Sequence, residues 1–157
     1  MAKDDAIDTL NHLISIAKDG AAGMTSAADH AKRPELKSSL QRLSQERDNV
    51  ASELQSLVRS LGGDPEKSGT TLGAAHRGWM NLKEAVSIAD DSSLLEECER
   101  GEDEAVKEFR EALGKPLPAQ VQQQVQSCFQ QVKQSHDQIR RMRNADPNAG
   151  AASVPNI

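Results

Sequence analysis

Aromatic residues are scarce in this chain of 157 residues, which has one Trp, two Phe and no Tyr. Proteins built from β-sheets are normally richer in aromatic and β-branched residues, so this composition argues against a sheet protein. The sequence is rich instead in Ala, Leu, Gln, Glu, Lys and Arg, which favour helices. We therefore predict an all-α protein of one domain, because a mass of 17.0 kDa is enough for one hydrophobic core.

Long apolar segments and an excess of basic residues are also missing. No stretch approaches the roughly 20 apolar residues that cross a bilayer, so we expect no membrane partner. The N-terminal residues lack the apolar segment of a signal peptide, and we expect a cytoplasmic location. A net charge of −5 argues against nucleic-acid binding. The basic cluster of Arg140, Arg141 and Arg143 falls at a predicted helix C-terminus, where positive charge favours the helix dipole.

Cysteine is limited to Cys98 and Cys128, both on apolar helix faces. Buried, reduced thiols are the usual state in a cytosolic chain, and this is our interpretation. A disulfide between facing helices is the alternative, which requires a narrow range of Cα spacing. We expect neither a base nor a helix N-terminus beside either thiol, so the sequence does not support a reactive cysteine.

Apolar residues recur at alternating steps of three and four along most of the chain, which predicts helices. The pattern and its interruptions predict five helices, over residues 4–31, 34–61, 71–89, 92–113 and 117–144. Gly20 and Gly23 keep the register of the first helix, so we expect it to be continuous with a close-packed or slightly bent middle. Gly62 and Gly63 are expected to end the second helix.

Short connections join the first two and the last two long helices, which predicts two antiparallel hairpins. The crossover between the hairpins is long enough to return along the bundle, and it carries the short helix at residues 71–89. We expect His76 and Trp79 to anchor that helix on the bundle. The prediction is a ferritin-like four-helix bundle over residues 1–144 with an extra crossover helix, followed by a disordered tail at 145–157.

Several segments carry a family resemblance: LNHLISIAKDGAAGM from Leu10, ELQSLVRSLGGDPEKSGT from Glu53, AHRGWMNLK from Ala75, LLEECERGEDEAVKEFREAL from Leu94 and VKQSHDQIR from Val132. Together they resemble an uncharacterised family of bacterial ferritin-like four-helix bundles, over nearly the whole chain except the tail. That family is known by its fold and by a domain of unknown function. The resemblance therefore implies an architecture, and the ferritin-like kinship suggests an association with stress.

A ferritin-like di-iron centre needs a Glu from each of two helices and a Glu-x-x-His motif from each of the other two. The segment 4–31 has no Glu, and the sequence contains no Glu-x-x-His motif. Glu99, Glu102 and His136 are the candidates for a vestigial metal site. We therefore expect no cofactor and no enzymatic activity, and the alternative is a divergent protein that binds one metal ion through these three residues.

Two charged residues, Arg47 and Glu102, lie on the apolar faces of their helices near the middle. A guanidinium at this position would repel a metal ion in the core. We interpret the two residues as a buried ion pair that specifies the register of the helices without adding stability. The alternative is that the Arg47 head group extends to solvent while its stem covers apolar surface.

Taken together, these features predict a non-enzymatic bundle that works through interactions, with a stress-associated role. Its partner would be a second copy or another protein, bound by helix packing through the Gln-rich last helix or the crossover helix. Protection of DNA, as in some ferritin relatives, is a weaker third hypothesis because the net charge is acidic.

Overall fold

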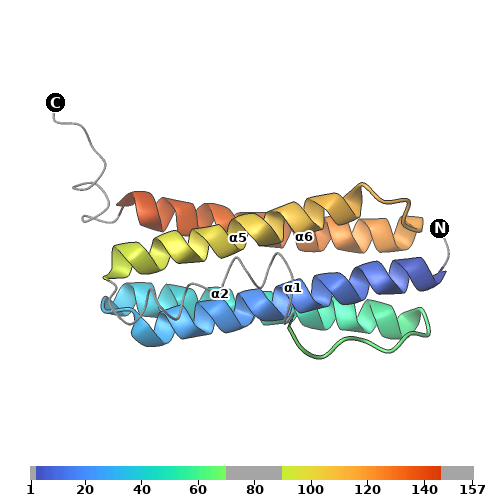
Figure 1. The fold of residues 1–157 in the computed structure, drawn as a ribbon, viewed down its shortest axis with the longest axis horizontal. Helices are drawn as coiled ribbons and strands as arrows, with labels where there is room; N and C mark the ends of the chain where they lie inside the picture. Colours follow the sequence, from blue (N-terminus) through green and yellow to red (C-terminus); the bar gives the residue numbers. More distant parts are fainter. Residues whose placement is uncertain (1–2, 70–89, 146–157) are drawn as a thin grey trace.

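The computed structural model describes residues 3–69 and 90–145, which form four helices and no strand (Figure 1). They are α1 (Lys3–His30), α2 (Pro34–Ser60), α5 (Asp91–Leu113) and α6 (Ala119–Ala145). The prediction of an all-α bundle is confirmed, and each helix ends within two residues of its predicted limits. The predicted crossover helix, with His76 and Trp79, lies outside the described residues, and so does the predicted tail after residue 145.

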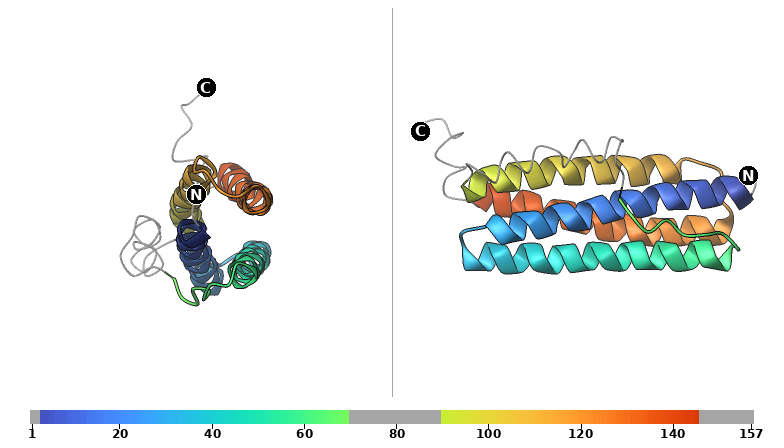
Figure 2. Two further views of the ribbon diagram at one scale, coloured as in Figure 1. Left: turned by 90° about the vertical axis from the view of Figure 1, so that its right-hand side faces the viewer. Right: turned by 60° about the horizontal axis from the view of Figure 1, so that its bottom comes forward.

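The four helices form two antiparallel hairpins, α1 with α2 and α5 with α6 (Figure 1). The chain leaves α2 at one end of the bundle and enters α5 at the opposite end. As a result α1 packs against α5, and α2 lies beside α6 (Figure 2). This is the predicted order of a hairpin, a long crossover and a second hairpin. No helix of the described segments is long and apolar enough to cross a membrane.

Helix α1 runs without a break through Gly20 and Gly23, as the continuous apolar register predicted. Helix α2 ends at the two glycines that follow it. Gly62 has a φ of 84°, a left-handed conformation that suits glycine, and the N–H of Gly63 donates to the carbonyl of Val58 at 3.0 Å. A Cβ on Gly63 would lie 2.9 Å from the Ile7 side chain, so a larger residue would not fit this turn.

The hydrophobic core consists of two apolar clusters that lie along the bundle. The first cluster includes Ala17, Val50, Ala105 and Val132, one from each helix. The second cluster includes the residues two helical turns away from these, which are Met24, Leu43, Cys98 and Ile139. Between these levels each helix presents a residue that is polar or has no side chain, namely Gly20, Arg47, Glu102 and Ser135. The core is therefore divided by a polar layer near its middle.

At one end of the bundle Asp91 joins the two hairpins. Its carboxylate, at the start of α5, accepts hydrogen bonds from the backbone N–H groups of Lys32 and Arg33 at 2.8 and 3.0 Å, and from Nε of Arg33 at 3.2 Å. Burial acts to raise the pKa of Asp91, but these hydrogen bonds outweigh it and hold the pKa below the ordinary 3.8. The turn between α1 and α2 is thereby fixed to the N-terminus of α5.

Replacing Asp91 by Asn should destabilise the protein by about 1.5–3 kcal/mol at pH 7, because charge-assisted hydrogen bonds are lost. A carboxylate with a lowered pKa contributes fully above its unfolded pKa, and this contribution is lost as the pH falls through the folded pKa. The difference between Asp91→Asn and the native protein should therefore shrink below pH 3.8. Urea unfolding followed by circular dichroism at pH 7 and at lower pH measures both effects.

The neighbouring Asp90 supplies a matched control, because it caps α5 by accepting a hydrogen bond from the N–H of Ser93 at 2.9 Å. Asn is as good an N-cap as Asp, so Asp90→Asn should change stability by only a few tenths of a kcal/mol. Equal losses in the two variants would contradict a special role of Asp91 in joining the hairpins.

Candidate functional site

The polar layer of the core is formed chiefly by Arg47 of α2 and Glu102 of α5. Nη2 of Arg47 donates to Oε2 of Glu102 at 2.6 Å, and the two side chains are 1% and 0% exposed. The structure thus brings together the two residues that the apolar pattern singled out, and the Arg47 head group lies inside the bundle and not in solvent. A buried pair of this kind gains Coulomb energy but loses hydration, so it need not add net stability.

Room for the guanidinium comes from Gly20 on α1. A Cβ built on Gly20 would lie 2.6 Å from Nη1 of Arg47 and 3.4 Å from its Cγ. Any side chain at this position would therefore press on the Arg47 head group and stem. The close-packed middle predicted for the first helix is this contact between a glycine and an arginine.

The ion pair leaves some polar atoms unsatisfied. Nη1 of Arg47, Oε1 of Glu102 and Oγ of Ser135 are buried and have no hydrogen-bond partner in the described part of the chain. Each such atom costs about 1–3 kcal/mol relative to a satisfied one. The layer therefore contributes less to stability than an apolar layer of similar volume would.

These residues do not fit the di-iron centre that a ferritin-like bundle implies. That centre requires several carboxylates and two imidazoles at mid-bundle. Among the described residues, Glu102 is the carboxylate that lies fully buried in this layer, and a guanidinium is bonded to it at 2.6 Å. At 4 Å a cation repels each unit of metal charge by about 4 kcal/mol in a protein-like dielectric. We therefore assign no di-iron chemistry to this layer.

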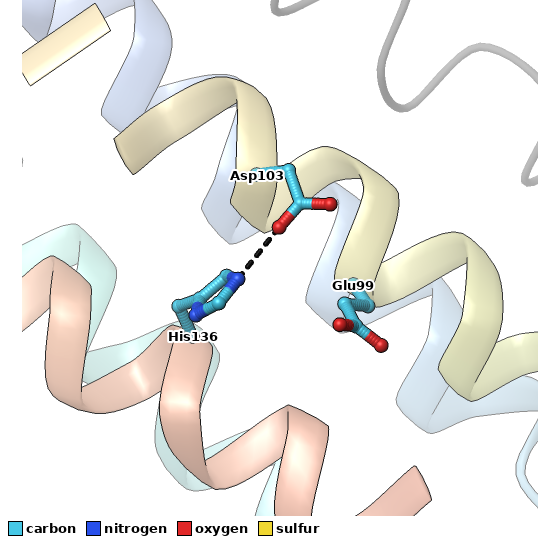
Figure 3. Close-up of side chains that lie close together, drawn as sticks. All are labelled: Glu99, Asp103 and His136. Carbon is cyan, nitrogen blue, oxygen red and sulfur yellow. Dashed lines mark hydrogen bonds and ion pairs between the residues drawn. The ribbon is translucent and has the colours of Figure 1, made fainter. Parts of the chain in front are cut away.

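A second polar group lies on the flank of the bundle, between α5 and α6. Glu99 and Asp103, one turn apart on α5, face His136 of α6, and a ligand atom from each lies within 4.8 Å of the others (Figure 3). Nε2 of His136 is 2.6 Å from Oδ1 of Asp103. The Glu99 and His136 side chains are each 9% exposed, whereas that of Asp103 is 58% exposed. The group is therefore anchored in the structure but open to solvent on one side.

Two arginines of α6 contact this flank group. Nε of Arg140 donates to Oε2 of Glu99 at 3.0 Å, and Nη1 of Arg143 lies 2.9 Å from Oε1 of the same carboxylate. The hydrogen bond to Glu99 raises the pKa of Arg140. On the other side of the imidazole, Nδ1 of His136 is 3.1 Å from Oδ1 of Asp137, and this hydrogen bond lowers the pKa of Asp137. Two arginines of the basic cluster that was predicted as helix-end charge, Arg140 and Arg143, thus share Glu99 as an acidic partner.

This geometry corrects the predicted set of vestigial ligands in one position. The sequence grouped Glu102 with Glu99 and His136, but Glu102 points into the core and binds Arg47, and Asp103 takes its place beside His136. Glu99 and Asp103 are four residues apart and share a helix face, whereas Glu102 lies on the apolar seam. The i,i+4 spacing of Glu99 and Asp103 was the signal that could have found the set.

A surface pocket of about 670 Å³ opens beside the flank group, and its lining includes Asp103, His136, Asp137 and Arg140. Solvent and small ions therefore have access to the imidazole. The flank group is the only cluster of three or more His, Cys, Asp or Glu residues with metal-ligand spacing among the residues that the structure describes.

The two cysteines are packed in the core, but the expectation that no base lies beside either thiol was wrong for Cys128, whose Sγ donates to Oε2 of Glu53 at 3.5 Å. Cys98 and Cys128 are free and buried, as predicted, and they form no disulfide with each other. Burial raises the pKa of Cys98, and it raises the pKa of Cys128 to about 12, so both thiols stay protonated at neutral pH. His12 lies at the surface, where its Nε2 is 2.9 Å from Oε2 of Glu108.

Comparisons with known proteins agree with this architecture. The family model described as "Domain of unknown function (DUF2383)" matches residues 5–115, which include α2, α5 and nearly all of α1. The bacterioferritin-related protein from Bacteroides fragilis, described as a dodecameric thioferritin, has a similar structure with a TM-score of 0.74 at 11% sequence identity. The similarity covers 99% of this chain and 94% of that chain. No curated protein matches the sequence.

The ion pair predicts a distinctive double-mutant cycle. Arg47→Met and Glu102→Leu should each cost about 3–5 kcal/mol, because each leaves a buried charge without its partner. The double variant should be close to the native protein or more stable, since it removes both charges and their unsatisfied atoms. Urea unfolding of all four proteins measures this, and a double variant that loses the sum of the two single losses would rule out the pair.

Gly20→Ala tests the contact between α1 and the guanidinium. Ala in place of Gly normally stabilises a helix interior by about 1 kcal/mol. Here the added Cβ displaces Nη1 of Arg47, so we expect a net loss of about 1–2 kcal/mol in the native chain. In the Arg47→Met background the same substitution should stabilise by about 1 kcal/mol. An effect of the same sign in both backgrounds would show that Gly20 does not make room for Arg47.

Proposed function

This chain belongs to the family of the domain of unknown function DUF2383, and from that premise we propose that it is a non-enzymatic, ferritin-like bundle protein that acts by assembling with protein chains. The observation that carries the proposal is the Arg47–Glu102 pair at the level where a ferritin-like protein would hold its di-iron centre. The Arg47 guanidinium bonds to the carboxylate that could bind iron, and it fills the space that two iron ions would need. We therefore place the function of this ferritin-like bundle on its outer surfaces, where it would contact other protein chains.

The surface that we propose for assembly is the outer face of α6. It carries a row of exposed uncharged side chains, which are Gln120, Gln123, Gln124, Gln126, Gln130 and Gln134. Amide groups both donate and accept hydrogen bonds, so a second copy of the same face can satisfy them without charge repulsion. The structurally similar protein from Bacteroides fragilis is described as dodecameric, which supports self-association as the simplest form of assembly. We further propose a cytoplasmic location and a stress-associated role from the ferritin-like kinship.

Light scattering of the purified full-length protein, made without an affinity tag, tests this proposal. We expect a mass of at least twice the 17.0 kDa of one chain. Gln123→Glu together with Gln130→Glu should shift the mass toward the monomer, because like charges would meet across the contact. Gln45→Glu, an exposed glutamine on α2, is the matched control and should leave the mass unchanged. A monomer at every protein concentration would contradict self-assembly.

A second candidate function is binding of a single metal ion, and the flank group of Glu99, Asp103 and His136 is the observation that favours it. Two carboxylates and an imidazole are a donor set that first-row transition metals accept. Metal analysis of the same tag-free protein separates the two candidates. Stoichiometric zinc, manganese or iron would favour the second, and its absence after incubation with these metals would remove it.

A further inference from the structure

We infer that Arg140 is a resident cation that occupies the flank group and competes with a divalent transition-metal ion for Glu99 and His136. This inference rests on the second function proposed above, and it adds the class of ion and the residue that controls access. Nothing in the predicted ligand set pointed to it, because Arg140 was interpreted from the sequence as a charge at a helix end.

The donor set defines the class of ion. Glu99 and Asp103 present carboxylate oxygens from successive turns of α5, and His136 presents a ring nitrogen from the facing helix (Figure 3). Ca²⁺ and Mg²⁺ prefer six or more oxygen ligands, whereas an imidazole favours Zn²⁺, Co²⁺ and their neighbours. Three protein ligands with one side open to solvent leave space for a water on the metal.

The orientation of His136 fits this role. Its Nε2 faces Asp103, and its Nδ1 lies 3.1 Å from the carboxylate of Asp137, which is on the opposite side of the ring. Histidine ligands of metals almost always use their second ring nitrogen to donate to a carboxylate or carbonyl, which fixes the tautomer. Asp137 is in place to accept that hydrogen bond while Nε2 faces the other candidate ligands.

Arg140 lies where the metal would lie. Its Nε is 3.0 Å from Oε2 of Glu99, and its Nη2 is 3.5 Å from Nε2 of His136. The guanidinium therefore contacts two of the three candidate ligands. The Arg140 side chain is 50% exposed, so it can turn into solvent when a metal ion takes its place. Arg143 would remain beside Oε1 of Glu99.

Titration of the tag-free full-length protein with Co²⁺, followed by visible absorption, tests the competition, and displacement of Co²⁺ by Zn²⁺ gives a second measure. Arg140→Gln should tighten Co²⁺ binding about tenfold, which corresponds to the loss of one charge-assisted contact. Arg143→Gln is the matched control, because it removes the same charge from the same carboxylate but does not contact His136. We expect it to change the affinity less than about threefold.

Substitutions of the proposed ligands test where the ion binds. Asp103→Asn and His136→Asn should each weaken Co²⁺ binding by at least about tenfold, in line with the loss of a donor. The Asp103 side chain is 58% exposed, so the Asp103→Asn variant should fold normally. This variant therefore still tests the site if the His136→Asn variant does not fold. His12→Asn, which alters a surface contact with Glu108, should leave the affinity unchanged.

The outcomes separate the inference from the function on which it rests. If the native protein binds Co²⁺ through Asp103 and His136 but Arg140→Gln has the same affinity as Arg143→Gln, the competition is wrong and the metal site stands. If neither the native protein nor Arg140→Gln binds Co²⁺, both the metal site and the competition are wrong.

Discussion

Arg47 and Glu102 come from different hairpins, and their side chains meet where the apolar core is interrupted. The packing of α1, α2 and α5 in the middle of the bundle depends on this contact. A rearrangement of the hairpins that separated the two side chains while one stayed buried would leave a charge without its partner, which costs about 3–5 kcal/mol. Gly20 is required on α1 because the guanidinium lies against it. The pair therefore links α2 to α5 and lies against α1 at one level of the core, although its unsatisfied atoms limit what it adds to stability.

The two polar regions of the protein differ in how firmly a guanidinium is held. In the core, Arg47 is 1% exposed and lies between Gly20 of α1 and Glu102 of α5. On the flank, Arg140 is 50% exposed and reaches Glu99 from the solvent side. Both arginines neutralise a carboxylate of α5. Among the described residues, only the flank position combines a carboxylate with an imidazole and an open side, so the metal site that we propose lies at the surface and not in the core.

The helices, their limits and the hairpin topology could be predicted because apolar periodicity, glycines and prolines report directly on local structure. The Arg47–Glu102 contact could be proposed for the same reason, since both residues break an apolar seam at mid-helix. The flank group was only partly predicted: Glu99 and His136 were named as ligands, Asp103 was missed, and Arg140 was named only as a charge at a helix end. The i,i+4 spacing could have placed Asp103 beside Glu99, but the contacts of Arg140 depend on the rotation of α5 against α6, which sequence periodicity does not fix. The contact of Gly20 with Arg47 likewise depends on how closely α1 and α2 approach.

In this bundle an ion pair stands where a ferritin-like protein would hold iron. Anomalous diffraction from crystals grown with Fe²⁺ or Zn²⁺ tests it most directly, because the anomalous signal locates bound metal without assumptions about ligands. The account predicts no anomalous peak in the mid-bundle layer, where density should show Arg47 bonded to Glu102. A metal peak beside Glu102, with the Arg47 side chain displaced, would contradict it.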